Sequence, residues 1–407
     1  MGHSADHPQL SSDAPSGVVG NPFRFDLREL SGALADLGTL APLAVGLVAV
    51  CGVGATALFL VTGVMYLVVA GVYRLPIPLQ PLKAAGAIAI AGALPVGAIA
   101  AAAWIVAGVL ALLAWTGGTA RLSRLFTRPV IRGIQLGVGL ILVKKGILFM
   151  LHGGGPDPRL VLGDGAGLAL AFLVAGVLAV GVFRPRVPSV LLVLVLSAAA
   201  GLLAGTIGMP PSLVGPEPLA VVVPSREEWL LGLVVLAIPQ LPLTLGNAVV
   251  ATEDCARVYF KDRARHVTAT RLSSTMAIGN VLAGLLGGMP MCHGSGGLTA
   301  HVRFGARSGA APAMLGAIFL TIGLAFGSGA QGFLLGIPPV TIGLLMAWIG
   351  VHHALLVKDL LADRLGLSIA GIVGLTGLLS SNLAVAFVLG MVLEVLRKVL
   401  MRHLVSS

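Results

Sequence analysis

Residues 75–94 read LPIPLQPLKAAGAIAIAGAL, and this stretch decides how the chain can fold. Proline has no backbone N–H and disfavours helix at the residue before it, so Pro76, Pro78 and Pro81 should hold 75–80 in an extended conformation. Proline is well tolerated in the first turn of a helix, so a short apolar helix is expected to begin at Pro81. The stretch therefore predicts an extended segment that leads directly into a half-length helix.

Apolar composition places this broken segment inside a membrane. Of the 407 residues, 57% are hydrophobic, 10% are charged and 56 are glycine, and the mean hydropathy is +1.00. The ranges 94–119, 229–252 and 308–357 contain no Asp, Glu, Lys or Arg, so each can hold a span of about 20 residues. Because these runs are apolar on every face, they do not fit the alternating strands of a β-barrel. The sequence predicts an all-α polytopic membrane protein.

About 14 spans are expected, seven on each side of a proline-rich loop at 206–228. Their expected ranges are 30–50, 55–72, 81–93, 95–116, 131–150, 166–183, 188–205, 229–251, 270–286, 294–302, 311–327, 332–356, 366–379 and 383–396. The stretch 365–393 is long for one span and short for two, so it forms either a tight hairpin at 380–382 or a re-entrant loop. An odd number of spans in each half inverts the second half relative to the first, as in many secondary transporters.

Basic residues define the expected orientation of these spans. With both termini in the cytoplasm, only Arg159 and Arg226 of the 26 Lys and Arg residues lie outside, and Lys83, Lys144 and Lys145 lie within spans. This asymmetry follows the positive-inside rule. The basic residues are spread over short loops with little aromatic interleaving, so the formal charge of +10 does not indicate nucleic-acid binding.

Two short internal similarities support an inverted duplication. Residues 36–39 (DLGT) are echoed by residues 244–247 (TLGN). We therefore expect two inverted seven-span repeats whose third and tenth spans are broken. The second similarity, around those breaks, aligns Pro78 with Pro290, Gln80 with Cys292 and Lys83 with Ser295.

The two breaks predict an anion site. The glycine-rich run at 294–297 is expected to be unwound, as 75–80 is. Non-helical backbone at membrane depth is tolerated only where it is buried or lines a cavity. If a pseudo-twofold axis relates the halves, both half-helix N-termini point at one central position, where each supplies N–H donors and about half a positive charge. We expect an anion to bind there.

Two stretches around the breaks carry a family resemblance. PIPLQPLKAAGAIA at 76–89 and GGMPMCHGSGGLTAHVRFGARSG at 287–309 resemble the signature stretches of the molybdate transporter family, which is related to the sulfate permeases. ELSGALADLGTLAPL at 29–43 and PQLPLTLGNAVVA at 239–251 resemble the first and eighth spans of that family. The resemblance therefore covers nearly the whole chain.

The resemblance implies the fold of the sulfate permeases and nucleobase symporters, in which a core domain moves like an elevator against a gate domain. This chain departs from the family pattern at Leu79 and Leu82, where Val and Met are commoner, and at 301–302, where His-Val replaces Gln and an aromatic residue. The implied division is a flexible polar tail at 1–28, a core domain at 29–125 and 229–328, and a gate domain at 126–228 and 329–407.

Lys83 is the first candidate binding residue, because a charge one turn into an apolar helix costs about 2.5 to 3.5 kcal/mol on insertion scales. It either stabilises substrate charge or pairs with Asp36, the only carboxylate deep in an expected span and the candidate proton-coupling residue. Other polar groups near the breaks can donate hydrogen bonds to an oxyanion or join helices to one another. These further candidates are Thr39, Gln80, Gln240, Thr244, Asn247, His293, Gly294, Ser295 and Gly296.

These features favour a secondary transporter for a tetrahedral oxyanion, working by alternating access and coupled to protons. The resemblance favours molybdate, while sulfate, tungstate, another anion, or an uncoupled anion channel on the same scaffold stay open. No HExxH, GxSxG or DDxxD motif indicates an enzyme, and no P-loop indicates ATP hydrolysis. Cys51, Cys255 and Cys292 lie far apart, so no disulfide, metal or cofactor is expected. The expected partners are the oxyanion, the lipid bilayer and a second copy of the chain, since homodimers are common in the wider superfamily.

The charge asymmetry generates a test of topology. In a background without cysteine, Arg124→Cys and Arg263→Cys should react with an impermeant thiol reagent only from the cytoplasm. Asp157→Cys and Glu217→Cys should react only from outside. Labelling of Arg124→Cys and Arg263→Cys from opposite faces would contradict the inverted repeat, because that arrangement places both loops on one side.

Overall fold

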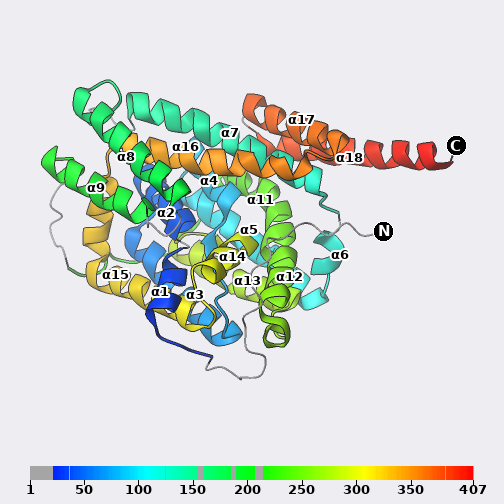
Figure 1. Ribbon diagram of the computed structural model, residues 1–407, viewed down its shortest axis with the longest axis horizontal. Coiled ribbons are helices and arrows are strands. Elements are labelled where there is room, and N and C mark those ends of the chain that lie inside the picture. The colour runs from blue at the N-terminus through cyan, green and yellow to red at the C-terminus, as the bar shows by residue number, and fades with distance from the viewer. Residues whose placement is uncertain are drawn as a thin grey trace.

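The computed structural model describes residues 22–35, 37–123, 125–153, 159–184, 189–206, 214–380 and 382–406, so most of the expected tail lies outside the described residues. The described chain is almost entirely helical (Figure 1). Within it, six helices are long and apolar enough to cross a membrane, which identifies an integral membrane protein. They are Ala55–Tyr73, Val96–Thr116, Arg128–His152, Arg226–Ala264, Ala310–Leu335 and Pro339–Leu360.

The first half of the chain contains nine α-helices and a two-residue strand among its described residues. They are α1 (Leu27–Leu34), α2 (Leu37–Cys51), α3 (Ala55–Tyr73), β1 (Gln80–Pro81), α4 (Lys83–Gly92), α5 (Val96–Thr116), α6 (Thr119–Ser123), α7 (Arg128–His152), α8 (Gly165–Phe183) and α9 (Ser189–Leu203). The expected first span at 30–50 is therefore two helices, α1 and α2, with the break after Ala35.

The second half repeats the pattern of a long composite span, a pair of helices around a break, and long closing helices. Its elements are α10 (Arg226–Leu231), η1 (Gly232–Ala237), α11 (Ile238–Leu243), η2 (Thr244–Val250), α12 (Ala251–Phe260), η3 (Lys261–Ala264), α13 (Ala269–Leu286), β2 (Met291–Cys292), α14 (Ser295–Arg303), α15 (Ala310–Leu335), α16 (Pro339–Leu355), η4 (Leu356–Leu360), α17 (Arg364–Ser380) and α18 (Leu383–Ser406).

Two expected boundaries were wrong. The helix after the first break begins at Lys83 instead of Pro81, because Gln80 and Pro81 form a strand. The expected gap at 328–331 is helical, and α15 continues to Leu335 through a kink at Phe326. Gly327, Gly329 and Gly332 weaken the helix but do not end it, and α15 stops only shortly before Pro338 and Pro339. The stretch 365–393 contains two packed helices, α17 and α18, as in the hairpin interpretation.

Two prolines reshape the expected eighth span without ending it. Pro239 and Pro242 cannot donate backbone hydrogen bonds, and the helix around them widens into the π-helical turns η1 and η2. Ile238 N donates to Leu233 O and Ala251 N to Gly246 O, five residues back in each case. The two widened turns flank α11, which lies against α4.

Glycine contacts hold two groups of helices together. α3, α5, α13 and α15 pack on one another as the α3 group, and α7, α8, α16, α17 and α18 as the α7 group (Figure 1). A Cβ on Gly139 of α7 would lie 2.4 Å from Gly350 O of α16, and one on Gly316 of α15 would lie 2.9 Å from Gly63 O of α3. Backbones therefore approach within van der Waals distance, as small residues allow in membrane helices. α2 and α4 lie between the groups. α2 contacts α15 and α16, and α4 contacts α5 and α7.

Candidate functional site

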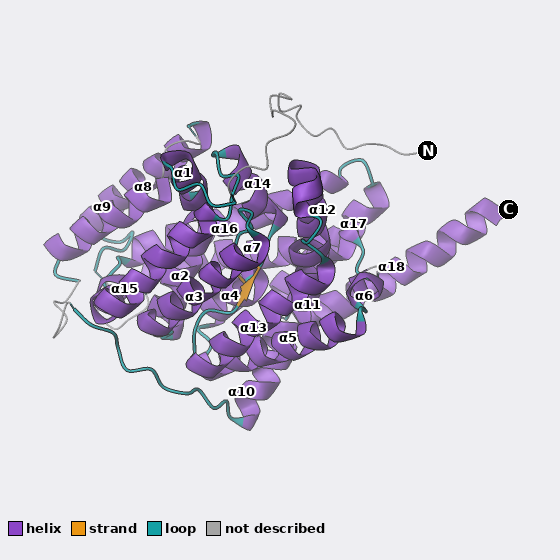
Figure 2. Cartoon of the chain, turned by 90° about the horizontal axis from the view of Figure 1, so that it is seen from below, coloured by secondary structure: helices purple, strands orange, loops and turns teal. Residues whose placement is uncertain are grey.

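A two-residue strand pair joins the two broken segments that precede α4 and α14. β1 and β2 are antiparallel, with Gln80 opposite Cys292 and Pro81 opposite Met291. Leu82 N extends the pairing by donating to Pro290 O at 2.9 Å. Figure 2 shows the strands in orange within the helical body, and their residues are buried. The pairing brings the N-termini of α4 and α14 together in the interior of the protein.

Side chains from other spans satisfy the proline segment before β1. His301 Nδ1 lies 2.9 Å from Pro76 O and His293 Nδ1 lies 2.9 Å from Pro78 O. Tyr66 donates its hydroxyl to Leu79 O at 2.6 Å. Carbonyls outside a helix need such partners when they are buried, because water is excluded at this depth. The extended conformation of 75–80 is thus supported by residues far from it in sequence.

Asn280 of α13 forms hydrogen bonds with the backbone of the second break. Its Nδ2 donates to Met291 O at 2.7 Å, and its Oδ1 accepts from Met291 N at 3.1 Å. The carboxamide therefore pairs with Met291 as a neighbouring strand would. Asn280 is fully buried, so its role rests on these bonds and on a third to Met276 O.

His293 is occupied on both ring nitrogens. Its Nδ1 contacts Pro78 O, and its Nε2 lies 2.8 Å from Thr275 Oγ1, which in turn lies 2.8 Å from the Tyr73 hydroxyl. The imidazole is fully buried and packs edge-on against the Tyr73 ring. Sequence reasoning placed His293 beside the substrate; in this structure its two nitrogens support the proline segment and α13.

The N-terminus of α4 is capped by Gln240 of α11. Gln240 Oε1 accepts from both Ala84 N and Ala85 N at 3.0 Å, and its Nε2 donates to Thr244 Oγ1 at 3.0 Å. Gln240 and Thr244 are both buried. Two candidates from the eighth span therefore lie at the expected place, and their polar atoms engage α4 and each other.

The N-terminus of α14 is more open. Ser295 donates its hydroxyl to Asn247 Oδ1 at 2.8 Å. A Cβ on Gly294 would lie 2.7 Å from Gln80 Oε1 and one on Gly297 would lie 2.4 Å from Gln80 Nε2, so the Gln80 amide covers one side of this first turn. A Cβ on Gly296 would meet nothing within 4 Å. Open space therefore adjoins the first turn of α14 at Gly296.

Lys83 extends across the gap between the two half-helices. Its Nζ would lie 3.7 Å from a Cβ on Gly294, so the ammonium group reaches the start of α14. Asp36 lies outside the described residues, and Thr39 lies on α2 with its side chain outside them, so the expected pairing of Lys83 with Asp36 stays a prediction.

The structure thus gathers Gln80, Lys83, Gln240, Thr244, Asn247, Gly294, Ser295 and Gly296 around the two half-helix N-termini. Sequence reasoning missed Tyr66, Tyr73, Thr275 and Asn280, which support the breaks. The available signal was a polar side chain within an otherwise apolar span. The chemistry on offer is a cation, hydroxyls, amides and helix N–H donors, which suits an anion. Among the described residues there is no cluster of three His, Cys, Asp or Glu that could hold a metal.

Comparison with known proteins identifies the family. The family described as "Molybdate transporter of MFS superfamily" matches residues 28–142 and 232–352, which include both breaks. The chain belongs to the molybdate transporter family. It is 30% identical to molybdate transporter 2 of Arabidopsis thaliana, over 91% of this chain and 87% of that protein. It is 28% identical to molybdate transporter 1 of Chlamydomonas reinhardtii, over 89% of this chain and 90% of that protein.

Solved structures show that this family member shares the fold of sulfate permease-like anion transporters. SLC26A9 superimposes with a TM-score of 0.66 at 13% identity, covering 92% of this chain. This chain spans 65% of the length of that one. The transmembrane domain of the cyanobacterial bicarbonate transporter BicA superimposes with a TM-score of 0.63 at 16% identity, covering 89% of this chain and 96% of that domain.

The pairing of Asn280 with Met291 generates a stability prediction. Asn280→Leu keeps the side-chain size but leaves a buried N–H and a buried C=O unpaired, each costing about 1 to 3 kcal/mol. The free energy of unfolding should fall by about 2 to 6 kcal/mol, measured by denaturant unfolding in detergent. Asn280→Asp, which keeps the acceptor for Met291 N, should lose less. A Leu variant as stable as the parent protein would contradict this role.

Proposed function

We propose that the protein is a secondary active transporter that carries molybdate across the membrane by alternating access. The observation that carries the proposal is the first turn of α14, which opens onto space at Gly296 and has the Lys83 ammonium group beside it. A cation and free helix donors side by side stabilise a dianion. Membership of the molybdate transporter family and the names of the curated relatives support molybdate as that dianion.

The substrate site lies between the breaks in this proposal. Lys83 neutralises part of the charge, the α14 amides donate hydrogen bonds, and Gln80, Ser295 and Asn247 line the sides. Thr39 of α2 is a further proposed ligand. Oxyanions of similar size, such as sulfate and tungstate, present the same charge and the same tetrahedral set of acceptor oxygens, so they are the natural competitors of molybdate.

Alternating access follows from the arrangement of the helix groups. The α3 group, with α1, α2, α4, α12 and α14, corresponds to the core domain at 29–125 and 229–328, and the α7 group to the gate domain at 126–228 and 329–407. The contacts of α2 with α16 and of α4 with α7 support a site at their boundary. The antiparallel register that puts Gln80 opposite Cys292 supports a local twofold axis, as an inverted repeat requires. Movement of the core against the gate then exposes the site to each side in turn.

Uptake of labelled molybdate into proteoliposomes tests the function. The parent protein should give saturable uptake, and unlabelled sulfate and tungstate measure the selectivity. Ser295→Asp should abolish binding and uptake, because a negative charge within a few ångströms of the dianion repels it strongly in a low dielectric. Ser368→Asp, at an exposed position of α17, is the matched control and should transport as the parent does. Undiminished molybdate binding by Ser295→Asp would remove the site from α14.

The expected coupling to protons gives a second test. A dianion entering a negative-inside cell works against about 4.6 kcal/mol per 100 mV, so accumulation needs a driving ion. We propose that Asp36 carries that proton. Asp36→Asn should retain molybdate binding and lose the stimulation of uptake by an inward proton gradient. If the variant responds to the gradient as the parent does, Asp36 serves only as a structural partner of Lys83.

A further inference from the structure

The N-termini of α4 and α14 are equivalent in position but differ in their hydrogen bonding. Each helix has three first-turn amides before its own ladder begins, since Gly86 N donates to Leu82 O and Leu298 N to Gly294 O. Such amides have no partner within their helix and attract an anion or a polar side chain. The two helices differ in which acceptors these N–H groups find.

At α4, a side chain occupies the position that an anion would take. Gln240 Oε1 accepts from Ala84 N and Ala85 N, both at 3.0 Å. Thr244 fixes the other end of the carboxamide by accepting from Gln240 Nε2 at 3.0 Å. Only 2% of Gln240 is exposed, so the carboxamide is held in place within the interior.

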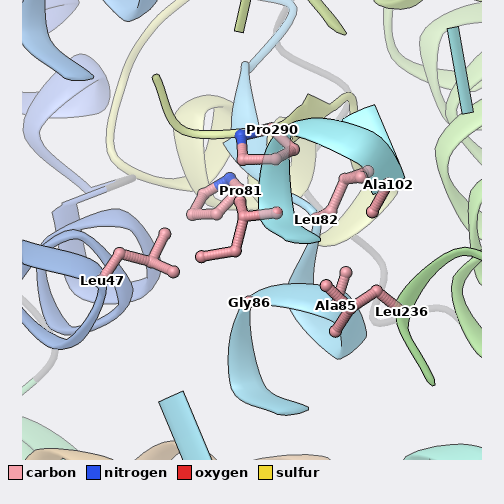
Figure 3. Close-up of a pocket in the computed structure, with 9 residues that line it drawn as sticks. Leu47, Pro81, Leu82, Ala85, Gly86, Ala102, Leu236 and Pro290 are labelled. Carbon is pink, nitrogen blue, oxygen red and sulfur yellow. The ribbon is translucent and has the colours of Figure 1, made fainter. Parts of the chain in front are cut away.

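On the neighbouring face of α4, the protein offers no polar site for a water molecule that could accept hydrogen bonds in place of Gln240. A cavity of about 10 Å³ adjoins the first turn, lined by residues that include Pro81, Leu82, Ala85 and Leu236 (Figure 3). A buried water needs about this much space and also two to four polar partners. The side chains around this cavity are apolar, so it offers no alternative acceptor to the amides of Ala84 and Ala85.

At α14, no described side chain accepts hydrogen bonds from the first-turn amides as Gln240 does at α4. The N–H groups of Ser295, Gly296 and Gly297 have no acceptor among the residues that the structure describes. Asn247 is the α14-side counterpart on the eighth span, but it accepts from the Ser295 hydroxyl and leaves the amides open. Beside these amides, the space at Gly296 is unfilled, since a Cβ there would meet nothing within 4 Å.

We propose that Gln240 is a positioning residue that stands in for an anion at α4, so that the transported oxyanion binds at α14 alone. This inference rests on the proposed function and assigns Gln240 a different part in it from that of a ligand. By filling one of two equivalent anion positions, the carboxamide confines the substrate to one position and limits the site to a single small oxyanion. Gln240 thereby contributes to selectivity without touching the substrate.

Replacement by glutamate tests the charge at this position. A protonated Glu can reproduce all three bonds, because its carbonyl accepts from the two amides and its hydroxyl donates to Thr244. An ionised Glu still caps α4 but brings a negative charge close to the bound dianion and to Lys83. The affinity of Gln240→Glu for molybdate should therefore be at least about tenfold below that of the parent near pH 8 and should approach it as the pH is lowered toward about 6.

Gln331 provides the matched control for this pH profile. Its Oε1 caps the N-terminus of α3 by accepting from Ala55 N at 2.7 Å, and it belongs to no part of the proposed site. Gln331→Glu introduces the same chemistry at another helix N-terminus. Its molybdate affinity should follow that of the parent at every pH. The readout is titration calorimetry of molybdate against the purified full chain in detergent.

Replacement by alanine distinguishes a positioning residue from a ligand. Gln240→Ala removes the stand-in and exposes the amides of Ala84 and Ala85, so molybdate should bind within about threefold of the parent affinity or more tightly. A monodisperse Gln240→Ala protein that binds at least about tenfold more weakly makes Gln240 a direct ligand and overturns the inference. If Gln240→Ala does not fold, Gln240→Glu tests the inference. A ratio of its molybdate affinity to that of the parent protein that does not change with pH would also overturn the inference. A parent chain that binds no oxyanion instead contradicts the proposed function itself.

Discussion

Backbone hydrogen bonding in the absence of water is the constraint on which this architecture depends. Three prolines remove donors from 75–81, and the chain inside a membrane cannot leave the remaining carbonyls exposed to lipid. Pairing of β1 with β2 solves part of this problem, and buried side chains such as Tyr66 and His301 solve the rest. Because the two breaks satisfy each other, the helices that follow them start from one place. The proposed anion site is a consequence of this arrangement.

Local features of the sequence were sufficient to predict the first break and its relation to the second. The expected unwinding of 294–297 was wrong, because α14 begins at Ser295 and the extended segment lies before it, at β2. Proline fixes backbone angles whatever surrounds it, so the extended segment before α4 followed from 75–81 alone. The internal alignment matched Gln80 with Cys292 and Lys83 with Ser295, and the structure pairs the first two and begins a helix at each of the others. Apolar length also located most of the long helices. It could not place the end of α15, because Gly329 in the expected gap at 328–331 can end a helix, yet the helix continues through it to Leu335.

Partnerships between distant side chains were beyond local reasoning. Gln240 and Ala84 are 156 residues apart, and nothing near either residue indicates that a carboxamide reaches an amide of another span. The same holds for Asn280, whose two bonds to Met291 depend on where α13 runs. A buried polar residue in an apolar span signals a partner of some kind, and only the packed structure distinguishes a protein partner from a substrate. For His293 both nitrogens find protein atoms.

The pairing of distant breaks also governs the order in which the chain can mature. Pro78 leaves the ribosome 215 residues before His293, the residue that binds its carbonyl. At about 5 to 20 residues per second, this delay is about 10 to 40 seconds. During that time the first half-helix has neither its strand partner nor its histidine donors, so lipid cannot receive it as a finished span. Insertion of the third span must therefore wait in a hydrated or protein-lined place until the tenth is made, and the two halves complete their folding together.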